Sequence, residues 1–393
     1  MVNALEGIKI IDLSLLFPGP FGTRYLADFG ADVIKIEYRS KPDLSRFVTP
    51  MVGDKGQKGR QSYFHHILNR NKKSISINLR TLEGVEIFKK LAKEADVIVE
   101  QFRPGVVDKL GIGYEDIKKI NPRIIYCAIT GYGQNGPYRD KAGHDLNYTG
   151  FAGLASLHRT REMEPILPGI QIADMFGGGL HAVIGILIAL IAREKTGKGQ
   201  YIDVSMMDGC VSFLPYILQS YLVDGVKLDV KGTTLTGGMA AYAIYKCKDG
   251  KYLTIGAIEP KFYQALCGVL VKEGLLSPDV TEQSYEDFKN IFLQKTRDEW
   301  YAILSKVDTC VAPMNEVWEA ENDPQVKARE MIIEVDTVHG KMKQLGFPIK
   351  LSETPASYRF GAPLVNEHTN EVLKELGYSE EELKELKKKI KAI

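Results

Sequence analysis

Gly143-His144-Asp145-Leu146-Asn147-Tyr148 opens the stretch around which this chain is organised, and Ala173-Asp174-Met175-Phe176-Gly177-Gly178-Gly179 closes it. The first segment puts a histidine beside a carboxylate. The second puts a carboxylate just before three glycines that open a long apolar helix, predicted over residues 175–193. Each glycine costs a helix roughly 1 kcal/mol relative to alanine, so we expect backbone or ligand to approach closely there. We therefore expect two groups that can transfer protons, His144 and Asp174, to lie in one site.

Apolar runs and helical patterns alternate on both sides of this stretch. We expect strands at residues 8–13, 32–37, 74–78, 97–100, 124–129 and 201–204, with helices such as 82–94 and 114–120 between them. This alternation predicts an α/β fold with a mostly parallel sheet. Ligands of such sheets bind beyond the carboxyl ends of the strands, where the polar loops 14–19, 101–104 and 131–136 follow. No Gly-x-Gly-x-x-Gly follows the first strand, which argues against a dinucleotide site of the usual kind.

The chain changes character after residue 232. Two β-like runs at residues 242–247 and 252–255 flank Lys248-Asp249-Gly250, which predicts a hairpin. Helices are expected at residues 206–222, 261–272, 285–294 and 296–306, so the centre of the chain reads as a smaller α+β domain. A last amphipathic helix is predicted at residues 379–391, with Ser379 as its N-cap and Glu382 in the capping-box position.

Composition excludes several classes of protein. Lys and Arg number 51 against 50 Asp and Glu, and the formal net charge of +1 gives no footprint for nucleic acid or an anionic membrane. Five scattered cysteines suit reduced thiols better than disulfides or a zinc site. No secretory signal is recognised at Met1. The longest apolar run, residues 182–192, is shorter than the roughly 20 residues of a membrane-spanning helix. We therefore predict a cytoplasmic protein without nucleic-acid or membrane partners.

His144 and Asp174 are the main candidates for catalytic residues, although each could instead have a purely structural role. A lone histidine is more often structural than catalytic, and Asp174 alone could be a helix N-cap. The functional interpretation puts Asp174 at a glycine-lined cleft, where a thioester could approach and the helix N-terminus would stabilise an enolate or oxyanion. Asp145 can orient His144 only if the backbone turns, which Gly143 permits. Glu259, before Pro260, is a weaker candidate.

Other sites are less well supported. No Gly-x-Ser-x-Gly elbow of a serine hydrolase is present, and His65-His66 lack metal-ligand spacing. The long connection over residues 41–71 ends in a basic run, Asn69-Arg70-Asn71-Lys72-Lys73. This run is either a solvated turn or an anion clamp for the phosphates of a nucleotide-like ligand, in which Arg70, Lys72 and Arg103 would take part.

Several motifs together resemble the class III CoA-transferase superfamily over nearly the whole chain. They are Leu5-Glu6-Gly7-Ile8, Asp12-Leu13-Ser14, Pro18-Gly19-Pro20, Leu26-Ala27-Asp28-Phe29-Gly30-Ala31-Asp32-Val33-Ile34-Lys35, Asn69-Arg70-Asn71-Lys72-Lys73-Ser74, Phe102-Arg103-Pro104-Gly105 and Thr196-Gly197-Lys198-Gly199-Gln200. The resemblance implies a large Rossmann-like domain built from both termini (residues 1–200 and 315–393), a small α+β domain (residues 201–314) and an interlocked homodimer.

The same resemblance implies that CoA, as part of the substrate, is bound mainly by the large domain, with no further cofactor. The CoA-binding positions that it implies are Arg39, Arg70, Asn71, Lys72, Gln101, Phe102, Arg103, Lys109, Gly143 and Tyr148.

Active-site motifs divide the superfamily into two chemistries. Transferases use the aspartate at the Asp174 position as a nucleophile, through a mixed anhydride and an aspartyl-CoA thioester. Members similar to α-methylacyl-CoA racemase use it as an acid/base and add a histidine in Gly-His-Asp-x-Asn-Tyr and a glutamate in Gly-Ala-Ile-Glu-Pro-x-Phe-Tyr. This chain has both, at His144 and Glu259. The segment Asp308-Thr309-Cys310-Val311-Ala312-Pro313 is also similar to the racemases.

The resemblance to the racemases implies proton transfer on both faces of an α-carbon. His144, oriented by Asp145, would serve one face, and Asp174, paired with Glu259, the other, through a planar thioester enolate. Two adjacent carboxylates do not easily both ionise, so the pair can hold a proton. The long 41–68 segment resembles the transferases more, and the 156–171 linker lacks the Pro-Leu-Asn that usually precedes the racemase aspartate. Transfer of CoA between carboxylic acids therefore stays an alternative, as does a catalytically idle acyl-CoA-binding subunit.

Overall fold

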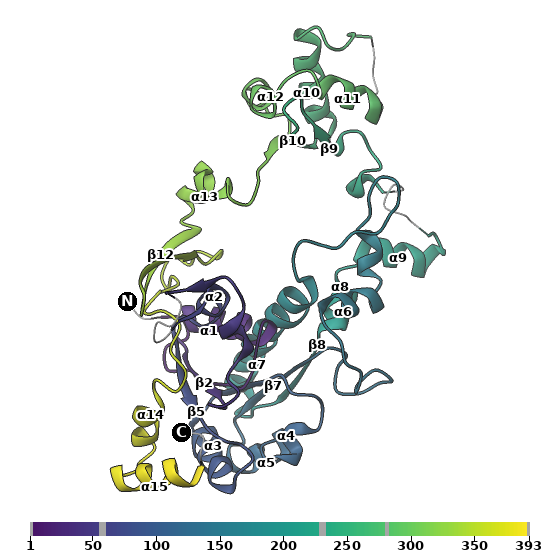
Figure 1. Cartoon of the computed structure of the whole chain (residues 1–393). Coiled ribbons are helices and arrows are strands. Elements are labelled where there is room, and N and C mark those ends of the chain that lie inside the picture. The colour runs from purple at the N-terminus through teal and green to yellow at the C-terminus, as the bar shows by residue number, and fades with distance from the viewer. Residues whose placement is uncertain (1–2, 55–59, 228–232, 280–282, 391–393) are drawn as a thin grey trace. The chain divides into compact units, whose positions relative to one another are not determined.

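The computed structural model describes residues 3–54, 60–227, 233–279 and 283–390 (Figure 1). The chain divides into two compact units. The large unit comprises Met1–Ala155, Leu167–Phe213 and Ala328–Ile393, and the small unit comprises Ser156–Ile166 and Leu214–Lys327. These boundaries differ from those expected at residues 200 and 315, because one further strand and helix after residue 200 belong to the large unit.

A six-stranded parallel sheet is the centre of the large unit. Its strands are β1 (Lys9–Asp12), β2 (Asp32–Glu37), β5 (Lys72–Ser76), β6 (Val97–Glu100), β7 (Ile125–Thr130) and β8 (Tyr201–Ser205). They lie in the order β5-β2-β1-β6-β7-β8, and every neighbouring pair is parallel. This is the strand order of the Rossmann fold, with its switch point between β1 and β6. The prediction of a large Rossmann-like domain is therefore confirmed, although the glycine fingerprint is missing.

Helices cover both faces of this sheet. They are α1 (Pro18–Asp28), α3 (Leu82–Glu94), α4 (Val106–Lys109), α5 (Tyr114–Ile120), α6 (Asp145–Phe151), α7 (His181–Thr196), α8 (Met206–Ser212), α14 (Thr369–Glu375) and α15 (Glu380–Ile390). Helix α3 begins where the Thr81 side chain accepts a bond from the Gly84 N–H, and it buries Ile87 and Phe88 in the core on one face. Val372 and Leu373 of α14 join that core, so the C-terminal segment helps to complete the large unit.

The segment over residues 41–71 is not the open loop that we expected. It contains η1 (Leu44–Phe47), β3 (Met51–Val52), β4 (Gln61–Ser62) and α2 (Tyr63–Asn69), and residues 55–59 lie outside the described part. Buried ion pairs hold it to β2: Arg46 binds Glu37, and Lys35 binds Asp43 at 2.9 Å.

The basic run at the end of this segment is also built into the core. The Arg70 guanidinium is fully buried and binds Asp28 at 2.7 Å. The Lys72 ammonium is fully buried between Asp12 (3.1 Å), Thr23 and Asn69. The Asn71 side chain donates to Asp28 and to the Ser357 carbonyl. These three side chains are closed to a ligand in this structure, because all their polar atoms face other protein groups. We therefore correct the anion-clamp hypothesis and leave them out of the CoA site.

Replacing Lys72 by alanine should lower the free energy of unfolding by about 3–5 kcal/mol, because it removes the ion-pair partner of the buried Asp12 carboxylate. Lys73→Ala is the matched control. Its ammonium pairs at the surface with the half-exposed Glu371, so its loss should cost about 1 kcal/mol or less. Urea denaturation of both variants measures the difference. Equal, small losses would contradict the structural role of Lys72.

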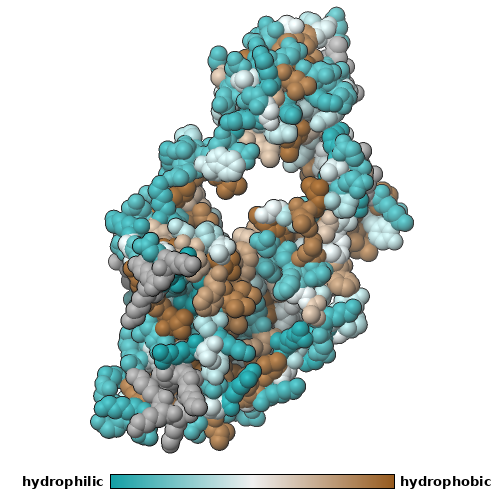
Figure 2. All heavy atoms as spheres, in the orientation of Figure 1, coloured by the Kyte–Doolittle hydropathy of each residue, from teal (hydrophilic) through white to brown (hydrophobic). Residues whose placement is uncertain are grey.

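The helix that follows Asp174 starts in an unusual form. A π-helical segment, η3 (Ala173–Leu180), runs directly into α7. Together, Ala173–Thr196 form a helix of 24 residues that by length and composition alone could cross a membrane, and it extends beyond the apolar run of residues 182–192 noted in the sequence. About a third of its most apolar window is buried in the chain. On α7, the side chains of Ile184, Ile188 and Ile191 are more than half exposed. Figure 2 shows in brown that apolar residues also reach the surface of the chain. The implied dimer stays a prediction.

The small unit is built around an antiparallel sheet. Its elements are β9 (Tyr242–Lys246), β10 (Tyr252–Gly256), β11 (Val311–Met314), α9 (Pro215–Asp224), α10 (Pro260–Lys272), α11 (Tyr285–Phe292), α12 (Arg297–Leu304) and α13 (Pro324–Ala328). The hairpin around Asp249-Gly250 is present, with Gly250 at φ +82°. Trp300, Phe288 and Leu266 centre its core. The expected helix over residues 206–222 is two helices, because Pro215 starts a new one. A hairpin of β12 (Ile332–Thr337) and β13 (Gly340–Leu345) in the large unit was not predicted.

Candidate active site

A pocket of about 520 Å³ lies at the carboxyl ends of the strands in the large unit. Loops after β1, β6 and β7 line it, together with the starts of α6 and η3. Predicted site residues that line it are Gln101, Phe102, Arg103, Gly143, His144, Tyr148 and Asp174. The structure thus brings the histidine and the aspartate of the opening stretch into one pocket, 30 positions apart in the chain.

Local backbone geometry presents His144 at the N-terminus of α6. His144 is extended and its N–H donates to the Asn147 side chain at 3.0 Å, which closes the first turn of the helix. The residue before His144 is a glycine. A Cβ at position 143 would lie only 2.7 Å from both the Tyr132 hydroxyl and the Tyr148 ring. The Tyr148 hydroxyl donates to the Gly143 carbonyl. His144 is exposed at the pocket, and Tyr132 and Tyr148 lie against the glycine that precedes it.

Asp145 acts on Asp174 rather than on His144. Its Oδ2 accepts a hydrogen bond from the Asp174 N–H at 3.0 Å, so the carboxylate satisfies the first backbone donors of η3. Among the described residues, no hydrogen bond joins it to the His144 ring. The expectation that Asp145 orients His144 is therefore replaced by a role in fixing Asp174. The same bond occupies a helix N-terminus that we had expected to stabilise an anionic intermediate.

The surroundings of the Asp174 carboxyl bring its pKa close to neutral pH. Burial raises its pKa to about 7, and the negative charge of Asp145 adds to the rise. Burial also raises the pKa of Asp145, although its backbone hydrogen bonds oppose this. Two neighbouring carboxyls in a half-buried site favour a single shared negative charge. Asp145 and Asp174 therefore form a carboxyl pair within the large unit, besides the predicted pair of Asp174 and Glu259.

The triple glycine after Asp174 serves packing. A Cβ on Gly177 would lie 2.6 Å from the Met206 carbonyl of α8, and one on Gly179 would lie 2.8 Å from the Pro18 carbonyl of α1. All three glycines are buried, so they seat η3 against two neighbouring helices, and none of them lines the pocket. This close packing fixes the backbone on which Asp174 stands.

Three cations stand at the pocket, and sequence reasoning found only one of them. Arg103 was predicted, whereas Arg139 and Lys141 were missed, along with Tyr132 and Asn147. The Lys141 ammonium lies 4.6 Å from the centre of the Tyr138 ring. The polar loop after β7, which we noted from the sequence, was the signal that pointed towards these missed residues. The lining does not include Arg39 or Lys109, both exposed, and their CoA contacts stay predictions.

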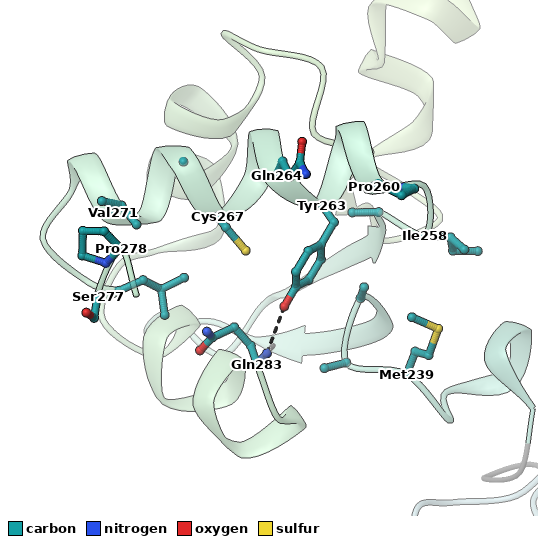
Figure 3. A pocket seen from close by; sticks show the side chains of 15 residues that line it. Met239, Ile258, Pro260, Tyr263, Gln264, Cys267, Val271, Ser277, Pro278 and Gln283 are labelled. Atoms are coloured by element: carbon teal, nitrogen blue, oxygen red, sulfur yellow. Dashed lines mark hydrogen bonds between the residues drawn. The ribbon is translucent and has the colours of Figure 1, made fainter. Parts of the chain in front are cut away.

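Glu259 belongs to the small unit, where it is the N-cap residue of α10 and is exposed. Its pairing with Asp174 stays a prediction. Its neighbours Ile258 and Pro260 line a mainly apolar pocket of about 770 Å³. Figure 3 shows Tyr263 and Cys267 of α10 pointing into this pocket, where the Tyr263 hydroxyl accepts a bond from the Gln283 N–H at 2.9 Å.

Comparison with known proteins places this geometry in a family. The family model for CoA-transferase family III matches residues 5–369. An acyl-CoA transferase from Fusarium pseudograminearum is 36% identical over 98% of this chain and 87% of its own. The α-methylacyl-CoA racemase from Homo sapiens is 34% identical over 98% and 96%. The crystal structure of a CaiB/BaiF family protein from Brucella suis superposes with a TM-score of 0.83, at 33% identity, over 96% of this chain and 100% of that one. The chain belongs to CoA-transferase family III.

Proposed function

We propose that this enzyme inverts the α-carbon of a 2-methyl-branched acyl-CoA by two-base proton transfer through an enolate. One observation carries the proposal: His144 and Asp174 line the same pocket, and the pKa of Asp174 is raised to about 7. A racemase needs one group that removes the α-proton and another that delivers a proton to the opposite face. The transferase mechanism would need Asp174 but would give His144 no chemical role.

The acyl-CoA would lie along the carboxyl edge of the sheet. We propose that the phosphates of CoA meet Arg103, Arg139 and Lys141, the three cations of the pocket. Guanidinium and ammonium groups give charge-assisted hydrogen bonds to phosphate oxygens. The thioester would then sit between His144 and Asp174. Glu259, as predicted from the resemblance, would support proton transfer from the small unit.

Deuterium washout tests this function directly. A 2-methylacyl-CoA carrying deuterium at the α-carbon should lose it in ordinary water, with no acceptor acid present. A transferase needs an acceptor and gives no exchange. Mass spectrometry of the recovered thioester measures the loss. No exchange over several chain lengths, with a folded protein, would rule the proposal out.

CoA transfer between carboxylic acids is the second candidate, favoured by the transferase relative of similar identity. In that chemistry, the Asp174 carboxylate attacks the acyl-CoA carbonyl and releases the CoA thiolate, leaving a mixed anhydride. CoA then attacks the aspartyl carbonyl, which frees the carboxylate and gives an aspartyl-CoA thioester. Hydroxylamine would displace CoA from that thioester and leave a hydroxamate on Asp174, which peptide mass spectrometry detects.

The pH profile should separate the two chemistries. Proton transfer needs one base ionised and the other protonated, so kcat/KM of a racemase should be bell-shaped, with one limb near pH 7 from Asp174. A nucleophilic Asp174 needs only to be ionised, so the rate should rise through pH 7 to a plateau.

Asp145→Asn keeps a hydrogen-bond acceptor for the Asp174 N–H but removes the charge that raises the Asp174 pKa. The Asp174 limb should therefore move to lower pH in this variant. Asp116→Asn, on the exposed surface of α5, removes the same charge elsewhere and should leave the limb in place. An unmoved limb in Asp145→Asn would mean that another group titrates near pH 7.

A further inference from the structure

Leu16, in the loop between β1 and α1, has a backbone conformation that leucine rarely adopts. Its φ angle is +58°, in the left-handed region, where a Cβ lies too close to the neighbouring backbone. Glycine, asparagine and aspartate occupy this region more readily than leucine does. Leu16 is also 37% exposed, so packing in the core does not explain a leucine at this position. A strained residue that is not part of the core is evidence for a role at a functional site.

Buried charged groups hold Leu16 and its loop in this conformation. The Leu16 N–H donates to Oδ1 of the buried Asp43 at 2.9 Å. Oδ2 of Asp43 pairs with the Lys35 ammonium, which also donates to the Ser14 carbonyl at 2.7 Å. The Ser14 N–H in turn donates to Oδ1 of Asp12 at 2.9 Å. The loop is therefore fixed at three backbone groups by side chains that are themselves buried.

This loop lies beside the part of η3 that carries Asp174. Leu16, Pro18 and Met206 line the same pocket as Asp174. The position that a Cβ on Gly178 would take lies 3.0 Å from the Cβ of Pro18 and 2.9 Å from the Met206 side chain. Gly178 follows Asp174 by about one helical turn. Leu16 is two residues from Pro18, so their Cα atoms are at most about 7 Å apart. An acyl group whose α-carbon reaches Asp174 therefore comes within reach of Leu16.

We propose that Leu16 is a specificity-determining residue that limits the size of the substituent on the α-carbon of the acyl group. Its side chain lies against this substituent and leaves room for a methyl group but not for a longer branch. The bonds from Asp43 and Lys35 matter for this role, because a leucine on a flexible loop would move aside for a larger branch. The inference rests on the proposed function and adds to it the residue that selects the acyl group.

The test measures the binding of acyl-CoA thioesters to the full chain in an Asp174→Asn background, where turnover does not interfere. 2-Methylbutanoyl-CoA and 2-ethylbutanoyl-CoA differ by one methylene in the α-branch, a difference that an apolar site distinguishes by about tenfold or more. Leu16→Ala should lower the ratio of their Kd values from about tenfold to about twofold or less. Leu16→Met, which nearly conserves the side-chain volume, should keep the preference. Isothermal titration calorimetry gives the Kd values.

Leu15→Ala is the matched control. Leu15 precedes Leu16 in the same loop and is exposed to nearly the same extent, at 38%, but it does not line the pocket. Its replacement should leave the ratio of Kd values unchanged. The strain has a separate readout, because glycine adopts a φ angle of +58° without a steric penalty. Leu16→Gly should therefore unfold at a higher urea concentration than Leu16→Ala.

Each result decides the role of Leu16. A ratio of Kd values that stays near tenfold in Leu16→Ala overturns the proposal, as does a parent that binds the two thioesters equally. An equal change for both thioesters and for free CoA also overturns it, because Leu16 would then act on the CoA moiety or on the fold. If no acyl-CoA reacts with the parent chain, the proposed function fails, whereas the ratio of Kd values still tests Leu16.

Discussion

Asp174→Asn should reduce turnover by at least about 10³-fold on every acyl-CoA, because an amide neither accepts a proton nor forms an anhydride. Steady-state assays of α-proton exchange and of CoA transfer measure the loss. The side chain keeps its size and its place at the start of η3, so the fold should survive. Since burial raises the pKa of this carboxyl, its ionised form is unfavourable in the folded protein.

That electrostatic cost provides a control on folding. Asp174→Asn should be at least as stable as the parent at pH 8, where the parent carboxyl is ionised in the folded protein. This advantage should shrink at pH 5, where the folded parent carboxyl is protonated although the unfolded one is still ionised. Denaturation at the two pH values gives the comparison. If the variant stays active on any acyl-CoA, Asp174 takes no part in the chemistry of either mechanism.

His144→Ala should abolish α-proton exchange while leaving much of any CoA transfer, and this contrast divides the two mechanisms. Loss of a general acid or base typically lowers the rate by about 10²–10⁴-fold. The helix behind His144 should persist, because its first turn is closed by the Asn147 side chain and the His144 backbone. Washout of α-deuterium and hydroxylamine trapping should be run on the same preparation.

His144→Gln offers a second variant that keeps a polar group but cannot carry a proton at neutral pH. It should behave as His144→Ala in exchange. Full exchange in both variants would show that His144 is a structural residue, which was the alternative interpretation of the sequence. Loss of transfer together with exchange would instead indicate damage to acyl-CoA binding.

The sequence by itself determined the layered architecture of the large unit. Its strands are short apolar runs and its helices have clear apolar spacing, as in β2 and α3, whose bounds match the prediction residue for residue. Such patterns are local, because a buried parallel strand is apolar along its length and a covering helix shows one apolar stripe. The family was likewise recognisable, because its motifs lie in continuous segments.

Only the tertiary structure decided which charged residues are available to a ligand. Arg70 and Lys72 look like ligands in the sequence, yet Asp28 and Asp12, some 42 and 60 positions away, bury them. Asp145 looks like a partner for its neighbour His144, but it binds the Asp174 backbone 29 positions on. A short motif shows which side chains are present, whereas their burial and partners depend on contacts across the fold. These contacts set the pKa of Asp174.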